Sequence, residues 1–415
     1  MLSRVALILM LVGACAGSAL AVRSSEPEPI RWHRSHSLGV PWNGRLVAGV
    51  RLPSEGVDFF TWDLVLKRSP DRPWRRWGSD RLLRMVLRVL DEYRAAHPEA
   101  ARIGIGDLSR PHGGNFDERY GGRGHASHQN GRDADVYYPR LDGLELAPTK
   151  PSQIDHELAQ ELVTRFVRAG AVKVFVGPHT GLRGPRRIVE KLIYHDDHMH
   201  VRIGPDPDPR ILLGRSTRGR RIDAVRVGDR QGSPTVLVVG CIHGNECAGT
   251  AVTRILARAS PAFDLWLVPN LNPDGLALGR RQNARGVDLN RNFPSEWSRR
   301  GRSGDPEYPG PRPFSERETR ILARLVRRIQ PDVTIWFHQP QGLVRAWGQS
   351  VPEARRYARH AGMRFRALRW PHGTGPNWQN HAFPGTSSFV VELPPGRLGG
   401  GAAARQARAV LALPQ

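Results

Sequence analysis

The chain has 415 residues, of which 39% are hydrophobic and 24% are charged, as in a soluble globular protein large enough for two domains. Its formal charge is +23, yet only four of its 62 basic residues are lysines, and the 58 arginines are spread over the whole sequence. This spread indicates a coding bias toward arginine and, without a recognised binding module, argues against a nucleic-acid-binding protein. A basic surface would still favour contact with an anionic polymer such as a cell wall.

The first 21 residues predict a secretory signal peptide. Arg4 precedes a short apolar run, and small residues then lead to a cleavage site at Ala19-Leu20-Ala21. The apolar run is too short to form a membrane-spanning helix. The segment over 12–15 also fits a lipobox, so lipidation of Cys15 stays open beside plain secretion. We therefore expect an exported protein, periplasmic or in the cell wall, which attaches to a membrane only through such a lipid anchor.

Residues 30–205 predict a first domain of the α+β class, built on a small sheet. One helix is expected over 79–98 with Ser79 as its N-cap, and a second from about Ser152 to Gly170. Four short β-prone runs surround these helices: ARIGIGDL, DADVYY, AVKVFVG and HMHVRI. A connection rich in Pro, Gly and Arg over 206–221 then predicts a linker.

Residues 222–415 predict a second domain, an α/β sandwich with a mixed sheet. Continuous apolar runs predict buried strands at PTVLVVG, DLWLVPN, DVTIWFH and SSFVVEL. Helices are expected from about Glu246 and after a capping box formed by Ser315 and Glu318. Cys241 and Cys247 stand on either side of IHGNE, and we expect them to be small buried thiols, although an exported protein can form a disulfide.

Metal-capable side chains gather in two segments of the first domain. GHASHQNGRDADVYY contains His128 and Asp135, and HDDHMHVRI follows some seventy residues later with His198 and His200. The last two are two residues apart in a strand-like run, so both point to one face. A hydrolytic zinc site needs about three protein ligands and a position for water. His128, Asp135 and His200 supply the ligands, and His198 is then the general base or transition-state stabiliser. Asp133 is expected to face away from the site.

This pattern resembles the penicillin-insensitive murein endopeptidases, within the wider lysostaphin and D-Ala-D-Ala peptidase group. That group uses His, six residues, Asp, and a distant His-x-His, and these endopeptidases have further histidines that match His125 and His195. SLGVPWNGRL also resembles their N-terminal segment. The resemblance covers about residues 35–203. It implies a fold of that type and hydrolysis of the D-Ala to meso-diaminopimelate cross-link of peptidoglycan, with His125 and His195 as supporting residues.

A second series of motifs runs through the other domain. VLVVGCIHGNECAG, NARGVDLNRNFP, IWFHQPQG and FVVELPPG follow one another in the order found in the zinc carboxypeptidase family, which the region over about 218–400 resembles. That family includes a murein-peptide amidase branch. The resemblance implies three zinc ligands: His243, Glu246 and His338.

The same resemblance implies the roles of the remaining residues. Glu392 matches the glutamate that activates water and shuttles its proton, and Asn290 and Arg291 match the pair that grips a substrate carboxylate. Arg281 is our choice for the arginine that polarises the scissile carbonyl, with Arg280 and Arg285 near enough to keep that choice open.

One departure from the family bears on the substrate. The family carries a tyrosine on a substrate-covering loop between its last zinc histidine and the glutamate. Here that interval contains only Tyr357, on an apparently helical segment, while GPNWQNHAFPG offers Trp378 and His381. We expect the compact interval to favour a murein amidase or small deacylase over a broad digestive carboxypeptidase.

Together these observations predict a bifunctional peptidoglycan hydrolase with two zinc ions, one per domain, acting on cross-links and stem peptides. Two alternatives stay open. One domain can be a catalytically silent wall-binding module, in which case the chain holds one zinc ion. A secreted polyanion binder would keep its binding after zinc is removed and lose it steeply with salt.

Overall fold

The computed structural model describes residues 28–116 and 127–413. The predicted signal peptide, with Cys15 and its lipobox, lies outside these residues, and so does His125. Across the described ranges, no helix has both the length and the apolar character needed to cross a membrane.

The N-terminal half is built on a six-stranded sheet with the strand order β4-β6-β7-β10-β8-β9. The strands are β4 (Phe59–Thr61), β6 (Ile103–Ile105), β7 (Asp133–Tyr137), β8 (Lys173–Val176), β9 (Val189–Lys191) and β10 (His198–Arg202). Two helices, α1 (Asp80–Ala96) and α2 (His156–Arg168), contact each other and contribute to one core with the strands. This is the α+β arrangement that the sequence predicts, while the assignment to the lysostaphin and D-Ala-D-Ala peptidase type stays a prediction.

Two short antiparallel pairs precede α1: β1 (His36–Val40) with β2 (Asn43–Val47), and β3 (Val50–Arg51) with β5 (Trp77–Gly78). The α1 helix begins as predicted, because the side chain of Ser79 accepts a hydrogen bond from the backbone N–H of Leu82. The α2 helix begins later than predicted. Its N-cap is Asp155, which accepts from Leu158, and Pro151–Gln153 form a separate 3-10 turn.

The C-terminal half is built on an eight-stranded mixed sheet with the order β11-β12-β14-β13-β15-β18-β16-β17. The strands are β11 (Arg210–Arg215), β12 (Arg221–Gly228), β13 (Thr235–Val239), β14 (Asp264–Val268), β15 (Val333–His338), β16 (Leu343–Ala346), β17 (Arg364–Ala367) and β18 (Ser387–Glu392). The central run β14-β13-β15-β18 is parallel throughout, and β12 and β16 flank it in antiparallel orientation. The predicted mixed α/β sheet is therefore observed.

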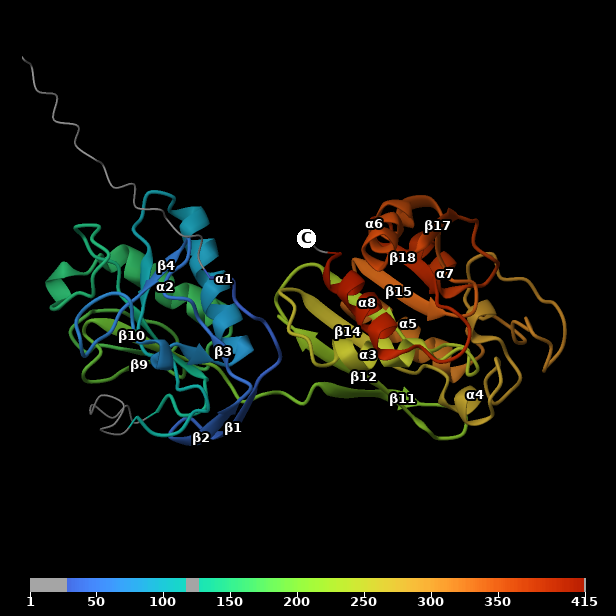
Figure 1. Cartoon of the computed structure of the whole chain (residues 1–415), viewed down its shortest axis with the longest axis horizontal. Helices are drawn as coiled ribbons and strands as arrows, with labels where there is room; N and C mark the ends of the chain where they lie inside the picture. The colour runs from blue at the N-terminus through green and yellow to red at the C-terminus, as the bar shows by residue number, and fades with distance from the viewer. Residues whose placement is uncertain (1–27, 117–126, 414–415) are drawn as a thin grey trace, which may run out of the picture.

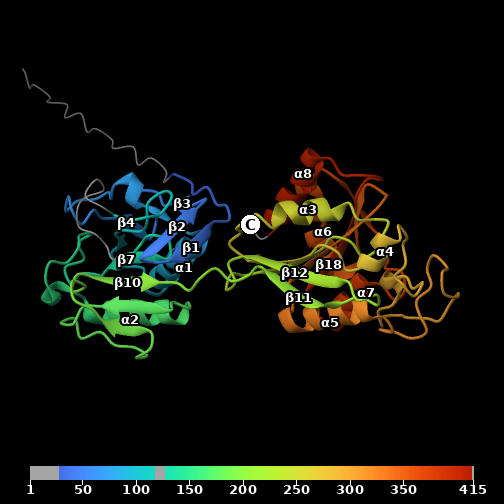
Figure 2. The ribbon, with the colours of Figure 1, turned by 90° about the horizontal axis from the view of Figure 1, so that it is seen from below.

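Helices cover both faces of this sheet: α3 (Gly249–Leu256), α4 (Pro273–Ala277), α5 (Arg317–Ile329), α6 (Val351–Ala361), α7 (Gly375–Ala382) and α8 (Gly400–Leu411). Figure 2 shows α3 and α8 above the sheet and α5 and α7 below it. The four parallel strands are buried along almost their whole length, as their apolar sequences require.

Three sequence expectations about this half need correction. Much of the predicted 206–221 linker is structured, because β11 pairs with β12. The first helix begins at Gly249, so Glu246 lies in the turn before it. The capping box does not form, since α5 begins at Arg317 after the N-cap Glu316, and the Ser315 hydroxyl instead donates to the Glu316 carboxylate.

The two halves lie side by side, and α1 is on the side of the N-terminal half that faces the C-terminal half (Figure 1). The buried Asp80 at the start of α1 accepts a hydrogen bond from the hydroxyl of Ser260, 2.6 Å away. Arg84, one turn further along, donates to the same hydroxyl at 3.1 Å. Arg88 pairs with Asp229 at 3.0 Å. Polar contacts from one face of α1 therefore join the two halves.

Candidate metal centres

Three buried side chains of the N-terminal half converge as a metal site requires. Each of His128, Asp135 and His200 offers a ligand atom, and these atoms all lie within 4.8 Å of one another. Asp135 Oδ1 is 3.3 Å from His128 Nε2 and 3.2 Å from His200 Nδ1. Two ligands of a tetrahedral zinc ion are about 3.3 Å apart when the bonds are about 2.0 Å long. The nitrogen and oxygen donors thus fit zinc in both chemistry and spacing.

The strand register explains how this cluster forms. In the antiparallel pair β7 and β10, His200 stands directly opposite Asp135, so the two side chains share one face. His128 comes from the loop before β7 and has a φ of +69°, which is uncommon for a residue with a side chain. Its Nδ1 hydrogen-bonds the carbonyl of Leu108 at 2.6 Å, which directs Nε2 toward Asp135.

Asp133 corrects the sequence expectation, because it belongs to the site. Residues two apart in a strand share a face, so Asp133 lies on the same side of β7 as Asp135. Its Oδ1 is 2.8 Å from His200 Nε2, the nitrogen that points away from the cluster. Asp133 is fully buried and also pairs with Arg202. A carboxylate in this position fixes the ring orientation of a metal-binding histidine.

His198 lies beside the cluster, next to the three ligands. Its Nδ1 contacts Asp197 Oδ1 at 2.7 Å, and its Nε2 is 3.6 Å from Asp135 Oδ1. The ring of His195 is 4.8 Å from the ring of His198. Burial, reinforced by the charge of His198, lowers the pKa of His195 to about 4, so its ring is neutral near pH 7. The neighbouring carboxylate of Asp196 contacts His179 and does not contact these rings.

The charges around the cluster keep its carboxylate ionised, which is the form that binds a metal ion. Burial would raise the pKa of Asp135, but the imidazoles of His128 and His198 hold it well below the usual range. Burial would also lower the pKa of His200, but hydrogen bonds to Asp133 and Asp135 outweigh this effect and raise it. The cluster therefore presents an ionised carboxylate between imidazoles, an arrangement in which a divalent cation replaces the protons.

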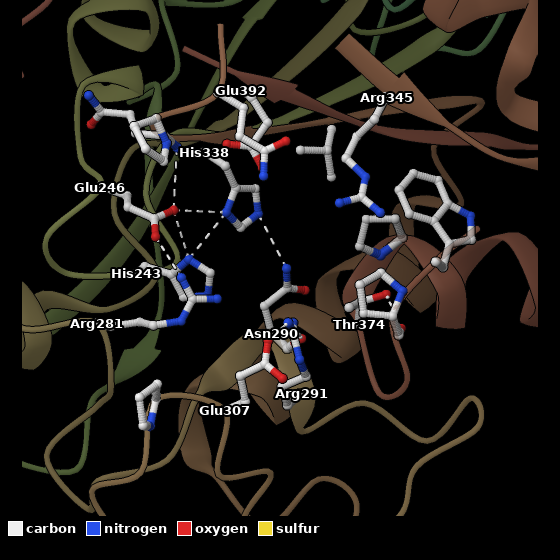
Figure 3. A pocket seen from close by; sticks show the side chains of 18 residues that line it. His243, Glu246, Arg281, Asn290, Arg291, Glu307, His338, Arg345, Thr374 and Glu392 are labelled. Carbon is white, nitrogen blue, oxygen red and sulfur yellow. Dashed lines mark hydrogen bonds and ion pairs between the residues drawn. The ribbon is translucent and has the colours of Figure 1, made fainter. Parts of the chain in front are cut away.

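A second cluster forms in the C-terminal half, from His243, Glu246 and His338. The two Nδ1 atoms of the histidines are 3.2 Å apart, and Glu246 Oε2 is 2.9 Å from His243 Nδ1 and 3.2 Å from His338 Nδ1. These separations again match a tetrahedral zinc ion, for which about 3.3 Å is expected. Figure 3 shows the three side chains pointing toward one another at one side of a pocket.

The ends of parallel strands bring this second cluster together. His338 is the last residue of β15 and stands opposite Glu392, the last residue of β18. His243 and Glu246 lie in the turn between β13 and α3, at the same edge of the sheet. Ligand sites in open α/β sheets form at the carboxyl ends of the strands in this way.

Two residues orient the imidazoles from outside the cluster. Asp288 Oδ1 is 3.0 Å from His243 Nε2, and the amide of Asn290 is 3.3 Å from His338 Nε2. Sequence reasoning missed Asp288 in this role, although it stands two residues before Asn290 in the same DLNRNF motif. The sequence does hint at this role, because Asp288 is an acidic residue within a motif that already contains two functional residues.

Glu392 faces the same pocket from β18. Its Oε2 is buried and has no hydrogen-bond partner among the residues that the structure describes. Burial and the neighbouring charge of Glu246 raise the pKa of Glu392 above its ordinary value. A carboxylate with a raised pKa beside a metal cluster suits proton transfer, because it accepts a proton more readily than an ordinary glutamate does.

The arginines around the pocket are engaged differently. Arg281 donates to Glu246 at 2.6 Å and to Asp288 at 3.0 Å, so it borders the cluster directly. Arg291 pairs with Glu307 at 2.5 Å and lines the pocket beside Asn290. Arg280 donates to a backbone carbonyl, and Arg285 is 3.8 Å from the buried Glu316. Of the three arginines considered for carbonyl polarisation, Arg281 is the one that lines the pocket.

Two further expectations have outcomes in this half. Cys241 and Cys247 form a disulfide with their Cα atoms 4.7 Å apart, so the expectation of free thiols is wrong. The bridge closes the turn that carries His243 and Glu246. Tyr357 is fully buried on α6 and hydrogen-bonds Gln406, so it belongs to the core as the helical sequence suggested.

Comparisons with known proteins agree with this geometry. Residues 37–174 match the family model of the penicillin-insensitive murein endopeptidases, and residues 209–367 match that of the zinc carboxypeptidases. Murein peptide amidase A of Escherichia coli (strain K12) is 37% identical over 123 residues, which are 25% of this chain and 48% of that protein. Metallocarboxypeptidase A of Trichophyton tonsurans is 29% identical over 204 residues, 39% of this chain and 48% of that protein.

The chain thus spans about half the length of these curated relatives. Among solved structures, murein-tripeptide amidase MpaA from Escherichia coli O157 has a TM-score of 0.42 at 26% identity, with 50% of this chain and 93% of that chain covered.

The two clusters and the two family matches together support a metallopeptidase. More specifically, the first part of the chain is similar to the penicillin-insensitive murein endopeptidases and the second part to the zinc carboxypeptidases. Both families are zinc-dependent. His128 and Asp135 lie within the first match and His200 lies after its end, whereas the second match contains all three residues of the second cluster.

Proposed function

We propose that the protein is a bifunctional zinc peptidase of peptidoglycan. In this proposal the N-terminal domain, 30–205, cuts the D-Ala to meso-diaminopimelate cross-link, and the C-terminal domain, 222–415, trims stem peptides. The observation that carries the proposal is the presence of two separate buried clusters, each with two imidazoles and one carboxylate at zinc-ligand spacing. Neither cluster borrows a ligand from the other half. We further propose that the protein is exported, since its substrate lies outside the cytoplasm.

In the N-terminal domain, zinc bound by His128, Asp135 and His200 would supply Lewis-acid activation for hydrolysis. The residues of the chain handle the protons. Asp197 holds His198 through Nδ1, which leaves Nε2 directed toward the centre as general base or transition-state stabiliser. His195, kept neutral by burial, supports the ring of His198. His125, which lies outside the described residues, is proposed as a second supporting histidine.

In the C-terminal domain, zinc bound by His243, Glu246 and His338 would again supply Lewis-acid activation. Glu392 takes a proton from the attacking water and passes it to the departing amine. Asn290 and Arg291 bind the carboxylate of the residue that leaves, with Arg291 exchanging its contact with Glu307 for the substrate. Arg281, at the border of the cluster, polarises the scissile carbonyl.

Digestion of purified cross-linked muropeptides, followed by mass analysis, tests both assignments. The wild type should convert dimers to monomers and shorten stem peptides by hydrolysis of the γ-D-Glu to diaminopimelate bond. His198→Ala should lose only the first reaction and Glu392→Gln only the second. Release of monomers by His198→Ala would rule out the endopeptidase assignment, and unchanged trimming by Glu392→Gln would rule out the other.

The competing hypothesis is that one half is a non-catalytic module that binds the cell wall. It predicts that variants in one cluster change binding to insoluble peptidoglycan without removing any hydrolytic product. A pull-down with insoluble peptidoglycan, run beside the digestion, distinguishes the two hypotheses.

A further inference from the structure

The pocket beside the C-terminal cluster has a volume of about 400 Å³ and is lined by three arginines, Arg281, Arg291 and Arg345. The first pairs with Glu246 and Asp288, and the second with Glu307. Arg345 differs from both, because no carboxylate of the described residues forms a salt bridge with it.

Arg345 is held in place although it forms no salt bridge, and Glu392 is the acidic group whose charge acts on it. It lies on β16, where it stands opposite Val390 of the neighbouring β18. Its Nη2 donates to the carbonyl of Arg369 at 3.1 Å, and its guanidinium carbon is 5.8 Å from the centre of the Trp370 ring. Its Nε is buried without a hydrogen-bond partner among the described residues. Figure 3 shows Arg345 reaching into the pocket from the side opposite His243 and Glu246.

A partly buried guanidinium without a salt-bridge partner is unfavourable in the free protein, and the charge of Glu392 offsets only part of this cost. Burial lowers the pKa of Arg345, which reflects the loss of hydration around its charge. Elsewhere in the pocket such charges are compensated by acidic side chains. A ligand carboxylate would compensate Arg345 in the same way, and the planar guanidinium suits that anion because it can donate two parallel hydrogen bonds.

The pocket therefore offers two separate positions for carboxylates. Asn290 and Arg291 lie on one wall, where the proposed function places the main-chain carboxylate of the leaving residue. Arg345 lies on another wall, on the same side as Thr374 (Figure 3), and Trp370 lines the pocket next to Arg345. A leaving residue bound by the first pair would extend its side chain across the cavity toward the second position.

We propose that Arg345 binds a carboxylate on the side chain of the leaving residue, so that the C-terminal domain prefers a leaving residue with two carboxylates. This inference rests on the proposed stem-peptide activity and adds the residue that selects the substrate. Diaminopimelate carries such a distal carboxylate, whereas lysine in the corresponding position of other stem peptides does not.

The test compares two synthetic peptides, L-Ala-γ-D-Glu-meso-diaminopimelate with its distal carboxyl group free and the same peptide with that group amidated. The full-length zinc-loaded protein should cleave the free acid with a kcat/KM about 10-fold to 100-fold higher, as expected when a buried charge-assisted contact is lost. Arg345→Gln should remove this preference by slowing cleavage of the free acid, mainly through KM, while the amide changes by less than about threefold. Arg359→Gln, at an exposed arginine on α6, is the matched control.

Three results would overturn the inference. The wild type can cleave both peptides equally, Arg345→Gln can keep the wild-type preference, or Arg345→Gln can slow both peptides equally with a shifted pH profile, which would assign Arg345 to tuning Glu392. If Arg345→Gln folds poorly, the comparison of the two peptides with the wild type still tests the preference for a free distal carboxylate. Failure of the wild type to cleave either peptide would count against the proposed trimming activity itself, so the two failures are distinguishable.

Discussion

The two metal centres reach the same ligand chemistry by different structural routes. In the N-terminal half, Asp135 and His200 face each other across two antiparallel strands, and the register of that pair places them on one face. In the C-terminal half, His338 ends a parallel strand, and His243 and Glu246 come from the turn after another. A register fixes the first centre, whereas the shared edge of a parallel sheet fixes the second.

This difference determines where the supporting residues are found. In the N-terminal centre the orienting carboxylate, Asp133, is 67 residues from the His200 that it contacts, but it is two residues from the ligand Asp135 on the same strand. In the C-terminal centre the orienting carboxylate, Asp288, is 45 residues from the histidine that it contacts. Supporting residues of a site built on paired strands can thus be predicted largely from the alternation of side chains along each strand. Those of a site at the edge of a parallel sheet depend on loops that the fold brings together.

The largest expected effect separates the two centres by their reactions. Asp135→Ala should lower cross-link hydrolysis by about 10³-fold or more and leave stem-peptide trimming within about threefold, because it removes a ligand from one centre only. Glu246→Ala should do the reverse. Initial rates on dimeric and monomeric muropeptides measure both. Loss of both reactions in either variant would show that the two centres act as one.

A smaller effect compares the two orienting carboxylates. Asp133→Asn and Asp288→Asn should each weaken zinc binding at their own centre by about 10-fold to 100-fold, since an amide holds the imidazole less well than a carboxylate does. Competition with a chelator measures the affinities. If Asp133→Asn binds zinc as tightly as the wild type, the same-face placement of Asp133 has no consequence for the metal.

The N-terminal half also contains a buried carboxyl group that makes its folding stability depend on pH. Burial, reinforced by the charges of Asp107 and Asp63, raises the pKa of Asp71 in the N-terminal half to about 9. Below pH 4 the carboxyl group is protonated in both the folded and the unfolded chain. Between about pH 4 and 9 only the unfolded chain ionises fully, so this residue lowers stability progressively as the pH rises.

Asp71→Asn removes this pH dependence, because the amide stays neutral. We expect it to raise the free energy of unfolding by about 1 kcal/mol or more at pH 8 and to have little effect at pH 4. Calorimetry of the full chain at several pH values measures the change, with the exposed Asp91→Asn as control. An equal effect at both pH values would contradict the raised pKa.

The smallest expected effect concerns the contact between the halves. Ser260→Ala removes the hydroxyl that Asp80 and Arg84 share, which should lower the free energy of unfolding by about 1 kcal/mol. Thermal unfolding measures it, and Ser298→Ala, at an exposed serine, is the control. An unchanged stability would indicate that this shared hydroxyl does not contribute to the contact between the halves.

Much of the fold could be predicted where the signals are local. The N-cap of α1 and the buried parallel strands were predictable because Ser79 and the apolar runs act on neighbouring residues. The capping box before α5 was wrong because the Ser315 hydroxyl donates to the adjacent Glu316 and accepts from the distant Asn292. The strand β11 was missed since its pairing with β12 outweighs a sequence rich in Arg and Gly.

The candidate sites show the same limit. The first ligand set could be named from motif spacing and the second from the resemblance to the zinc carboxypeptidases, and the structure brings each set together. Asp133 was misplaced through an error of strand alternation, which the sequence itself could have corrected. Asp288 and Arg345 could not be assigned from spacing, because their roles depend on which long-range neighbours the sheet provides.

The zinc content of the purified chain is the most direct test of the claim that each half holds its own metal centre. Elemental analysis after dialysis should find two zinc ions per wild-type chain, and one in either Asp135→Ala or Glu246→Ala. One zinc ion in the wild type, lost entirely in one variant and unchanged in the other, would contradict the account and leave a single active centre.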